Sequence, residues 1–113
     1  MVASLRRVSL DGATVSRLAA PPGWDYLDYP GGEILMRAET PVEQAWRVKA
    51  CAKEPWTAGW LDTIGPGDRL FNIGACVGSY ALIAAYRGAR VVAVEASPIN
   101  GARLAENVAA NHL

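Results

Sequence analysis

Two glycines and a carboxylate, Gly74, Gly78 and Glu95, have the residue types and the spacing of a site for a ribose-containing ligand. Glycines in a tight turn let the backbone approach a ligand, and a carboxylate at the tip of the next strand can accept both ribose hydroxyl protons. Gly74 and Glu95 lie 21 residues apart. That separation is close to the roughly 20 expected for such a pair. The pattern therefore predicts nucleoside binding.

The elements that must position these residues follow in order along the chain. Residues 69–73 form a short run with β-branched and aromatic side chains after the turn-forming residues 65–68, which is typical of a strand. Residues 77–87 are apolar almost all round and predict a short helix. Residues 91–94 are a continuous apolar run, typical of a parallel strand buried on both faces, and Glu95 follows at its end. The whole predicts a βαβ unit.

The composition of the turn discriminates between nucleotide ligands. A dinucleotide site requires G-x-G-x-x-G so that a pyrophosphate can sit at the helix N-terminus. Here Cys76 replaces the middle glycine. A nucleoside without phosphates, such as S-adenosylmethionine, does not need that cradle. An NAD-binding oxidoreductase is the less favoured alternative.

Three stretches of this region resemble a known family. N-I-G-A-C-V-G-S-Y-A-L, V-V-A-V-E-A-S-P-I-N and L-A-E-N-V-A-A-N-H-L are similar to the first two motifs and the second helix of the FkbM-type S-adenosylmethionine-dependent methyltransferases. The upstream segments E-P-W-T and G-P-G-D are also similar to what precedes the first strand in that family. The resemblance covers roughly residues 54–113. Members of the family are class I methyltransferases that mostly methylate hydroxyl oxygens of sugars, polyketides and related small molecules.

The resemblance implies an α/β fold, namely the first two parallel strands and the helices of a Rossmann-like class I methyltransferase. We expect a small β-rich and helical cap in residues 1–53 and the first part of the S-adenosylmethionine-binding domain in residues 54–113. The chain differs from the family at two positions. The family's first strand usually ends in an acid where this chain has Asn72, and the family commonly has Asn where this chain has Cys76.

The resemblance also implies S-adenosylmethionine as the cofactor and a set of contacts to it. The expected cofactor-binding residues are Asn72, Gly74, Ala75, Cys76, Gly78, Glu95, Ala96 and Ser97. Asn72 would contact the amino-acid end, Glu95 the ribose, and Ala96 and Ser97 the adenine. For Glu95 the alternative is a carboxylate that caps the next helix, which Ser97-Pro98 begin. No residue is a convincing catalytic base, and His112 is expected at an exposed helix end.

The first half of the chain predicts a cap. Asp11-Gly12 between apolar runs is a hairpin signal, and residues 33–37 predict another strand after a cluster of aromatic residues. That cluster, Trp24, Tyr26, Leu27 and Tyr29, could line a substrate mouth, but local core or an interface is the commoner explanation.

A capping box at residues 40–43 predicts a helix that continues to about residue 52, with Val42, Ala45 and Trp46 on one face. A second short helix is expected at residues 56–64. By resemblance this region packs near the cofactor's methionine end, where Glu54 and Thr57 are candidates for contacts. The ordinary interpretations are a solvated Glu54 and a Thr57 that begins a helix.

Composition excludes several classes of function. The 113 residues are 51% hydrophobic with a formal net charge of zero, which predicts a globular chain without a strong electrostatic partner such as a nucleic acid. Cys51 and Cys76 have no metal-ligand spacing, so two reduced thiols and no metal site are expected. The N-terminus lacks a signal-peptide pattern and no apolar run reaches membrane-spanning length, which favours a cytoplasmic protein.

The expected strand pair has two open edges, which invite pairing with another chain. We therefore expect an amino-terminal fragment of a methyltransferase, acting on a small-molecule or sugar hydroxyl, whose partner is a second copy or a complementing segment. A non-catalytic fragment or dimerisation module is the alternative function.

Overall fold

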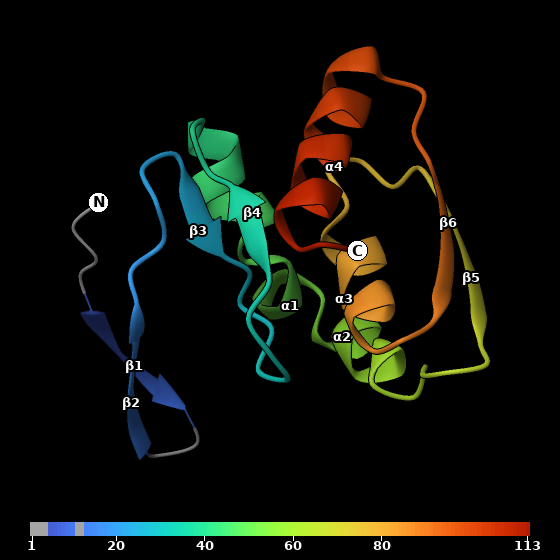
Figure 1. Cartoon of the computed structure of the whole chain (residues 1–113). Coiled ribbons are helices and arrows are strands. Elements are labelled where there is room, and N and C mark those ends of the chain that lie inside the picture. The colour runs from blue at the N-terminus through green and yellow to red at the C-terminus, as the bar shows by residue number, and fades with distance from the viewer. Residues whose placement is uncertain (1–4, 11–12) are drawn as a thin grey trace.

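The computed structural model describes the backbone of residues 5–10 and 13–113 and the side chains of residues 19–113. The elements follow the chain in the order β1 (Leu5–Leu10), β2 (Ala13–Leu18), β3 (Trp24–Tyr26), β4 (Leu35–Arg37), the π-helical segment η1 (Glu43–Arg47), α1 (Ala50–Lys53), α2 (Pro55–Leu61), β5 (Arg69–Ile73), α3 (Ser79–Tyr86), β6 (Arg90–Val94) and α4 (Pro98–Ala110). The fold is mixed α/β, and Figure 1 shows how the elements are arranged.

The predicted βαβ unit is present. β5 pairs in parallel with β6, with Arg69 opposite Arg90 and Ile73 opposite Val94, and α3 forms the crossover between them. α3 packs on both strands because four of its eight residues, Ala81, Leu82, Ile83 and Ala84, are buried apolar side chains. α3 and α4 lie on the same side of the strand pair (Figure 1).

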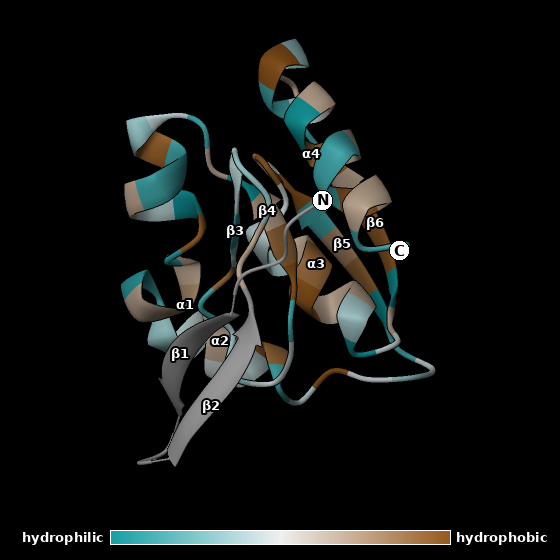
Figure 2. Cartoon of the chain, turned by 60° about the vertical axis from the view of Figure 1, so that its left-hand side comes forward, coloured by the Kyte–Doolittle hydropathy of each residue, from teal (hydrophilic) through white to brown (hydrophobic). Residues whose placement is uncertain are grey.

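The expectation that the second strand is buried on both faces is wrong. Side chains along β5 and β6 alternate between half-buried and exposed, and those on the face away from α3 are exposed. Phe71 and Ile73 on β5 are 67% and 73% exposed, and Val92 and Val94 lie beside them on β6. The apolar side chains of β6 that point away from α3 therefore lie on a face that no element among the described residues covers. Figure 2 shows the hydrophobic character of β6 and α3.

Two antiparallel strand pairs precede this unit. β1 and β2 pair from Leu5 opposite Leu18 to Leu10 opposite Ala13, as the hairpin signal predicts, although Asp11 and Gly12 lie outside the described residues. β3 pairs with β4, whose three residues fall within the predicted strand at 33–37. The β-rich part of the cap is therefore present.

The capping box at the start of the predicted helix is confirmed. The Glu43 N–H donates to Thr40 Oγ1 at 3.1 Å, and the Thr40 N–H donates back to Glu43 Oε2 at 3.0 Å. The Glu39 N–H donates to the same carboxylate oxygen at 2.9 Å. These bonds satisfy backbone donors that the first turn of a helix otherwise leaves unpaired.

A continuous helix to residue 52 is not observed, so this prediction is wrong. Asp28 accepts the N–H groups of Cys51 and Ala52 at 2.9 and 2.8 Å, so it caps a new helix, α1, at the point where the first would have continued. The widened π turn, in which the Val48 N–H donates to the Glu43 carbonyl, precedes that break. The bonds from Cys51 and Ala52 to the distant Asp28 carboxylate are thus favoured over continuation of the first helix.

The buried residues of this segment differ from the expected ones. The predicted apolar face, Val42, Ala45 and Trp46, is exposed, and Trp46 is 55% accessible to solvent. Val48 and Ala50 enter the core instead. The helix predicted at 56–64 forms as α2, which begins at Pro55 and ends at Leu61.

Buried side chains from both halves of the chain form a single core. Leu27, Ile34 and Met36 of the cap pack in the same cluster as Leu82 and Ile83 of α3. The domain boundary expected between residues 53 and 54 stays a prediction.

Two asparagines one turn apart fasten α4 to the cap. Asn107 is fully buried; its Oδ1 accepts the Arg37 N–H at 2.8 Å and its Nδ2 donates to the Val77 carbonyl at 2.9 Å. Asn111 pairs in the same way with the N–H and the carbonyl of Leu35, both at 2.8 Å. The amides therefore bond the backbone of β4 as a neighbouring strand would.

An ion-pair cluster stabilises the same junction. The Arg103 guanidinium of α4 pairs with Glu43 at 2.7 Å, Glu106 at 2.8 Å and Glu39 at 3.0 Å. Burial acts to raise the pKa of Glu43, but the N–H groups of Thr40 and Glu39 and the charge of Arg103 outweigh it, so this pKa is lowered. Glu43 is consequently ionised in the folded protein well into the acidic range.

These shifts predict a loss of stability in acid. A carboxyl whose pKa is lower in the folded than in the unfolded chain contributes stability that is complete above its unfolded pKa of about 4.3. That contribution is lost as the pH falls through the folded pKa. The melting temperature, measured from pH 7 to pH 2, should therefore decrease once the pH drops below about 4.5. Glu43→Gln should be less stable at pH 7 and show a shallower decline; a parallel decline would contradict the assignment.

Among the described residues, no helix combines the length and the apolar character needed to cross a membrane.

Candidate functional site

The turn between β5 and α3 adopts left-handed backbone conformations at three positions. The φ angles are 75° at Gly74, 54° at Cys76 and 96° at Gly78. Glycine adopts positive φ freely, whereas a residue with a Cβ does so at a cost in backbone strain. Cys76 thus holds a conformation that glycine or asparagine would adopt more readily.

The backbone N–H groups of this turn are already used within the protein. Those of Gly74 and Ala75 both donate to the Val94 carbonyl, at 2.8 and 2.9 Å. That of Cys76 donates to Glu95 Oε2 at 2.7 Å. A pyrophosphate is held by free N–H groups of such a turn. The geometry therefore suits a ligand that approaches the turn without phosphates.

The Glu95 carboxylate connects the turn to the loop that follows β6. Its Oε1 accepts the Ser97 N–H at 2.8 Å, in addition to the bond from Cys76. These two donors, that of Ser97 first, lower the pKa of Glu95, so the group is anionic at neutral pH. A carboxylate offers roughly four acceptor positions. Two of these positions accept the backbone N–H groups of Cys76 and Ser97. A contact between the remaining positions and a ribose stays a prediction.

A polar hollow of about 220 Å³ lies at the carboxyl end of β5. One wall is the β5 end and the turn, with Asn72, Gly74, Ala75 and Cys76. The opposite wall comes from η1 and the α1–α2 junction, with Arg47, Lys53 and Glu54. Tyr80 and Ser79 of α3 also line it. The polar hollow is therefore the place where the predicted turn residues meet charged side chains.

Hydrogen bonds from α3 hold the two walls together. Ser79 Oγ donates to the Arg47 carbonyl at 2.9 Å, and the Tyr80 hydroxyl donates to the Ala50 carbonyl at 3.2 Å. Burial, followed by the charge of Glu54, raises the pKa of Tyr80 to about 12, so this hydroxyl stays protonated at neutral pH. The residue pattern did not indicate Arg47 or Tyr80 as site residues, because hydrogen bonds between distant segments bring them to the hollow. It did not indicate Lys53 either.

The polar hollow is not lined by the other predicted site residues, which are Gly78, Glu95, Ala96 and Ser97. A Cβ at Gly78 would clash with Leu104 Cδ1 of α4, so the end of this leucine would have to move. Gly74, in contrast, has no atom within 4 Å of such a Cβ. Ser97 is the N-cap of α4 and its side chain accepts the Asn100 N–H at 3.3 Å; Ala96 beside it is exposed.

Glu54 and Thr57, named as candidates near the methionine end, form a local pair. Thr57 Oγ1 donates to Glu54 Oε2 at 3.1 Å across the first turn of α2. Glu54 lines the polar hollow, whereas Thr57 does not. His112 is exposed beyond the end of α4, as expected.

The aromatic cluster of the cap does not line the polar hollow. Leu27 and Tyr29 are buried, and the Tyr29 ring meets Tyr86 edge to face at 6.3 Å between ring centroids. Trp24 is half-buried with the Arg37 guanidinium 4.5 Å above its ring. The cluster therefore supports packing of the cap.

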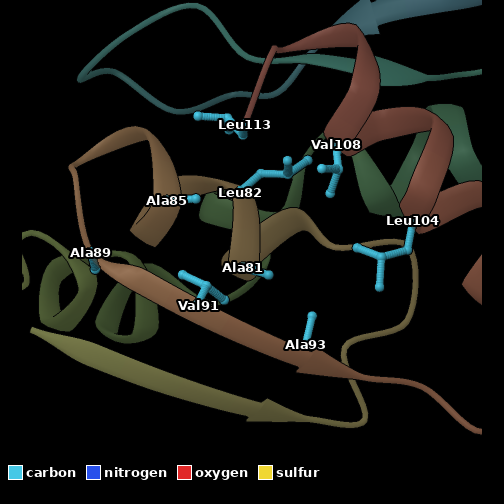
Figure 3. Close-up of a pocket in the computed structure, with 9 residues that line it drawn as sticks. All are labelled: Ala81, Leu82, Ala85, Ala89, Val91, Ala93, Leu104, Val108 and Leu113. Atoms are coloured by element: carbon cyan, nitrogen blue, oxygen red, sulfur yellow. The ribbon is translucent and has the colours of Figure 1, made fainter.

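A second hollow, of about 340 Å³, lies between α3, β6 and α4 (Figure 3). The side chains that point into it, including Leu82, Val91, Leu104 and Val108, are apolar throughout. An apolar cavity without polar groups has nothing to orient a ligand. The polar hollow is therefore the better candidate site. Within the described part of the chain no three His, Cys, Asp or Glu side chains gather as a metal site.

Comparison with known proteins identifies no family. No family model matches the chain, and no curated protein matches it. The methyltransferase resemblance accordingly stays a prediction from the motifs.

The left-handed conformation of Cys76 leads to a testable prediction. Cys76→Asn should raise the free energy of unfolding by about 0.5–1 kcal/mol, because Asn tolerates positive φ better and keeps the N–H bonded to Glu95. Denaturant-induced unfolding would measure the change. Cys76→Ala is the matched control, since it keeps a Cβ without the asparagine preference. Equal stabilities of the two variants would contradict the explanation.

Proposed function

We propose that this chain is the cofactor-binding portion of a Rossmann-like class I S-adenosylmethionine-dependent methyltransferase that acts on a small-molecule or sugar hydroxyl. The observation that carries the proposal is the polar hollow at the carboxyl end of β5, which brings Asn72, Gly74, Ala75 and Cys76 together. Ligands of parallel α/β sheets bind beyond the carboxyl ends of the strands.

The residues present fit such a cofactor in three respects. Gly74 faces open space, so a ligand can approach the backbone there. The turn N–H groups of Gly74, Ala75 and Cys76 are bonded internally, which suits a nucleoside better than a dinucleotide. Glu95, which remains ionised at neutral pH, can accept ribose hydroxyls with the acceptor positions that its backbone bonds leave over.

The bound cofactor would supply an electrophilic methyl group for in-line transfer to a hydroxyl oxygen. The contribution of this chain is to bind and orient. Gly74 admits the nucleoside to the turn, Glu95 fixes the ribose, and Asn72 offers an amide to the amino-acid end. The remaining expected residues have a less direct role. Ala96 and Ser97 follow Glu95 and would border the adenine. Gly78 lies against Leu104 of α4 and supports the turn.

Titration of S-adenosylhomocysteine into the chain by calorimetry tests the proposal. We expect saturable binding, and roughly tenfold weaker binding by Glu95→Gln, which corresponds to about 1.4 kcal/mol. Glutamine retains one acceptor oxygen, for the N–H of Cys76 or of Ser97 but not for both, so circular dichroism and thermal unfolding must show that the variant is folded before weaker binding is assigned to the ribose contact. NAD should not bind. A folded chain that does not bind S-adenosylhomocysteine would contradict the proposal.

A second candidate function, self-association, is favoured by one observation. The exposed side chains of Phe71, Ile73, Val92 and Val94 form a contiguous apolar face on β5 and β6, and each strand has one edge unpaired among the described residues. A second copy could cover this face. Light scattering should then show a dimer that Ile73→Lys dissociates; a strictly monomeric chain would count against it.

A further inference from the structure

The strand pair of β5 and β6 has a face that points away from α3 and α4 (Figure 1). We call it the outer face, and its side chains are those at the exposed positions of the two strands, namely Arg69, Phe71, Ile73, Arg90, Val92 and Val94. Within the described residues no element covers these side chains. Parallel strands are normally covered on both faces. The outer face is therefore a surface that is suited to a partner.

Positive charge is concentrated at one end of the outer face. Arg69 and Arg90 occupy facing positions of the parallel register, at the amino ends of the two strands, and both are exposed. Within the part of the chain that the structure describes, neither guanidinium makes a hydrogen bond or an ion pair. The carboxylate next to Arg69 in sequence, Asp68, accepts the Gly65 N–H at 2.9 Å. Because like charges on facing strand positions repel, this end of the face requires a counter-charge.

The two arginines line a hollow of about 260 Å³ together with Leu70, Phe71 and Val92. Arginine and aromatic side chains are among the residues that contribute most of the binding energy at protein interfaces. A guanidinium can pair with a carboxylate through two parallel hydrogen bonds. The hollow is therefore suited to an acidic side chain whose apolar neighbours contact Phe71 and Val92.

The dimensions of the outer face match a single helix. Each strand contributes five residues, which span roughly 16 Å at about 3.3 Å per residue. About eleven helical residues cover the same length. A helix with its side chains is also roughly 10 Å wide, which is close to the width of two paired strands. One short amphipathic helix would thus cover the whole face.

A second copy of this chain matches the outer face less well. A two-fold axis along the strands would bring the arginines of one copy against those of the other. An axis across the strands would place the arginines over Ile73 and Val94, which carry no charge. The carboxylates near the two ends of the face, Asp68 and Glu95, already accept backbone N–H groups of their own chain. Self-association therefore leaves the arginines without a counter-charge.

We propose that the outer face docks an amphipathic helix of another polypeptide, whose acidic side chains, at one end of its apolar stripe, pair with Arg69 and Arg90. The apolar stripe covers the four apolar side chains of the face. This inference is independent of the proposed cofactor site, because none of the six side chains of the outer face lines the polar hollow.

Fluorescence anisotropy with two synthetic peptides tests the proposal. The probe is a labelled helical peptide with leucines along one face and a pair of glutamates at one end of that face. In the control peptide, lysines replace the glutamates. The wild-type chain should bind the glutamate peptide roughly tenfold more tightly than the lysine peptide, the effect of one charge-assisted pair. Added salt should reduce this difference.

A charge exchange provides the sharper test. The double variant Arg69→Glu with Arg90→Glu should prefer the lysine peptide by a similar factor. Both side chains are exposed and make no internal bonds among the described residues, so circular dichroism should show an unchanged fold. Lys49→Glu, at an exposed cation between η1 and α1, is the matched control and should leave both affinities unchanged. Ile73→Lys should weaken the binding of the glutamate peptide, because it places a charge under the apolar stripe.

The outcomes decide which occupant the outer face takes. Equal affinity of the wild-type chain for the two peptides would overturn the proposal, and so would a folded monomer that does not bind the glutamate peptide. A dimer in light scattering that the glutamate peptide does not dissociate would assign the face to a second copy. A preference for the glutamate peptide that reverses with the charge of the arginines supports the acidic helix.

Discussion

Asn107→Ala is expected to lower the free energy of unfolding by about 2–4 kcal/mol, among the largest effects of any single substitution in this chain. The Asn107 amide is fully buried and bonds the Arg37 N–H and the Val77 carbonyl. Truncation leaves the buried Val77 carbonyl and the part-buried Arg37 N–H without their partner, and a buried group left in this way costs about 1–3 kcal/mol. It also leaves a cavity where the amide was packed.

Denaturant-induced unfolding, followed by tryptophan fluorescence, would measure this loss. Asn111→Ala is the matched control, because Asn111 makes equivalent bonds to Leu35 one turn further along α4 but is only half-buried. Water can replace the Asn111 amide, so its loss should cost less. A loss at Asn107 no larger than the loss at Asn111 would show that burial of the amide is not the cause.

Gly78→Ala is expected to lower the free energy of unfolding by about 2–3 kcal/mol for two separable reasons. A positive φ costs a residue with a Cβ about 1–2 kcal/mol. The new methyl group would also clash with Leu104 Cδ1, so the end of this leucine side chain must move.

Two matched variants separate strain from contact. Gly74→Ala meets the same kind of backbone strain at φ 75° but has open space around the Cβ, so it should be the milder change. Adding Leu104→Ala to Gly78→Ala removes the clash, and the double variant should lose less than the two single losses combined. Additive losses would mean that the clash contributes nothing.

The sequence predicted the βαβ unit closely because its signals are local. The bounds of β5 match the predicted strand at 69–73, and Ser97 caps α4 as Ser97-Pro98 indicated. The capping box of residues 40–43 also formed. In each case a few neighbouring side chains determine the backbone conformation.

Predictions that depended on distant partners were the ones that were wrong. The helix from the capping box breaks because Asp28, far back in the chain, caps α1 at Cys51 and Ala52. Periodicity assigned Val42 and Trp46 to a buried face, but both side chains are exposed to solvent. An apolar run cannot indicate how many of its faces the rest of the molecule covers.

The candidate site also contains residues that local patterns indicated and residues that only long-range contacts bring into place. Spacing singled out Gly74, Gly78 and Glu95, and of these Gly74 lines the polar hollow whereas Gly78 and Glu95 do not. On the opposite wall Glu54 was a candidate, but Arg47 was not, because Arg47 is held at the hollow by the bond from Ser79, and 32 residues separate the two in sequence. The pair of asparagines at helical spacing, 107 and 111, was the signal that could have revealed the docking of α4.

The asparagine bonds to β4 have a kinetic consequence. They close loops of 70 residues between Arg37 and Asn107 and 76 residues between Leu35 and Asn111. Contacts of such high sequence separation form late and slow the folding of a small domain. The second edge of β4 thus stays incomplete until α4 docks, so the cap and the βαβ unit should form in one cooperative step. The Arg37 amide should accordingly exchange with solvent deuterium only through global unfolding.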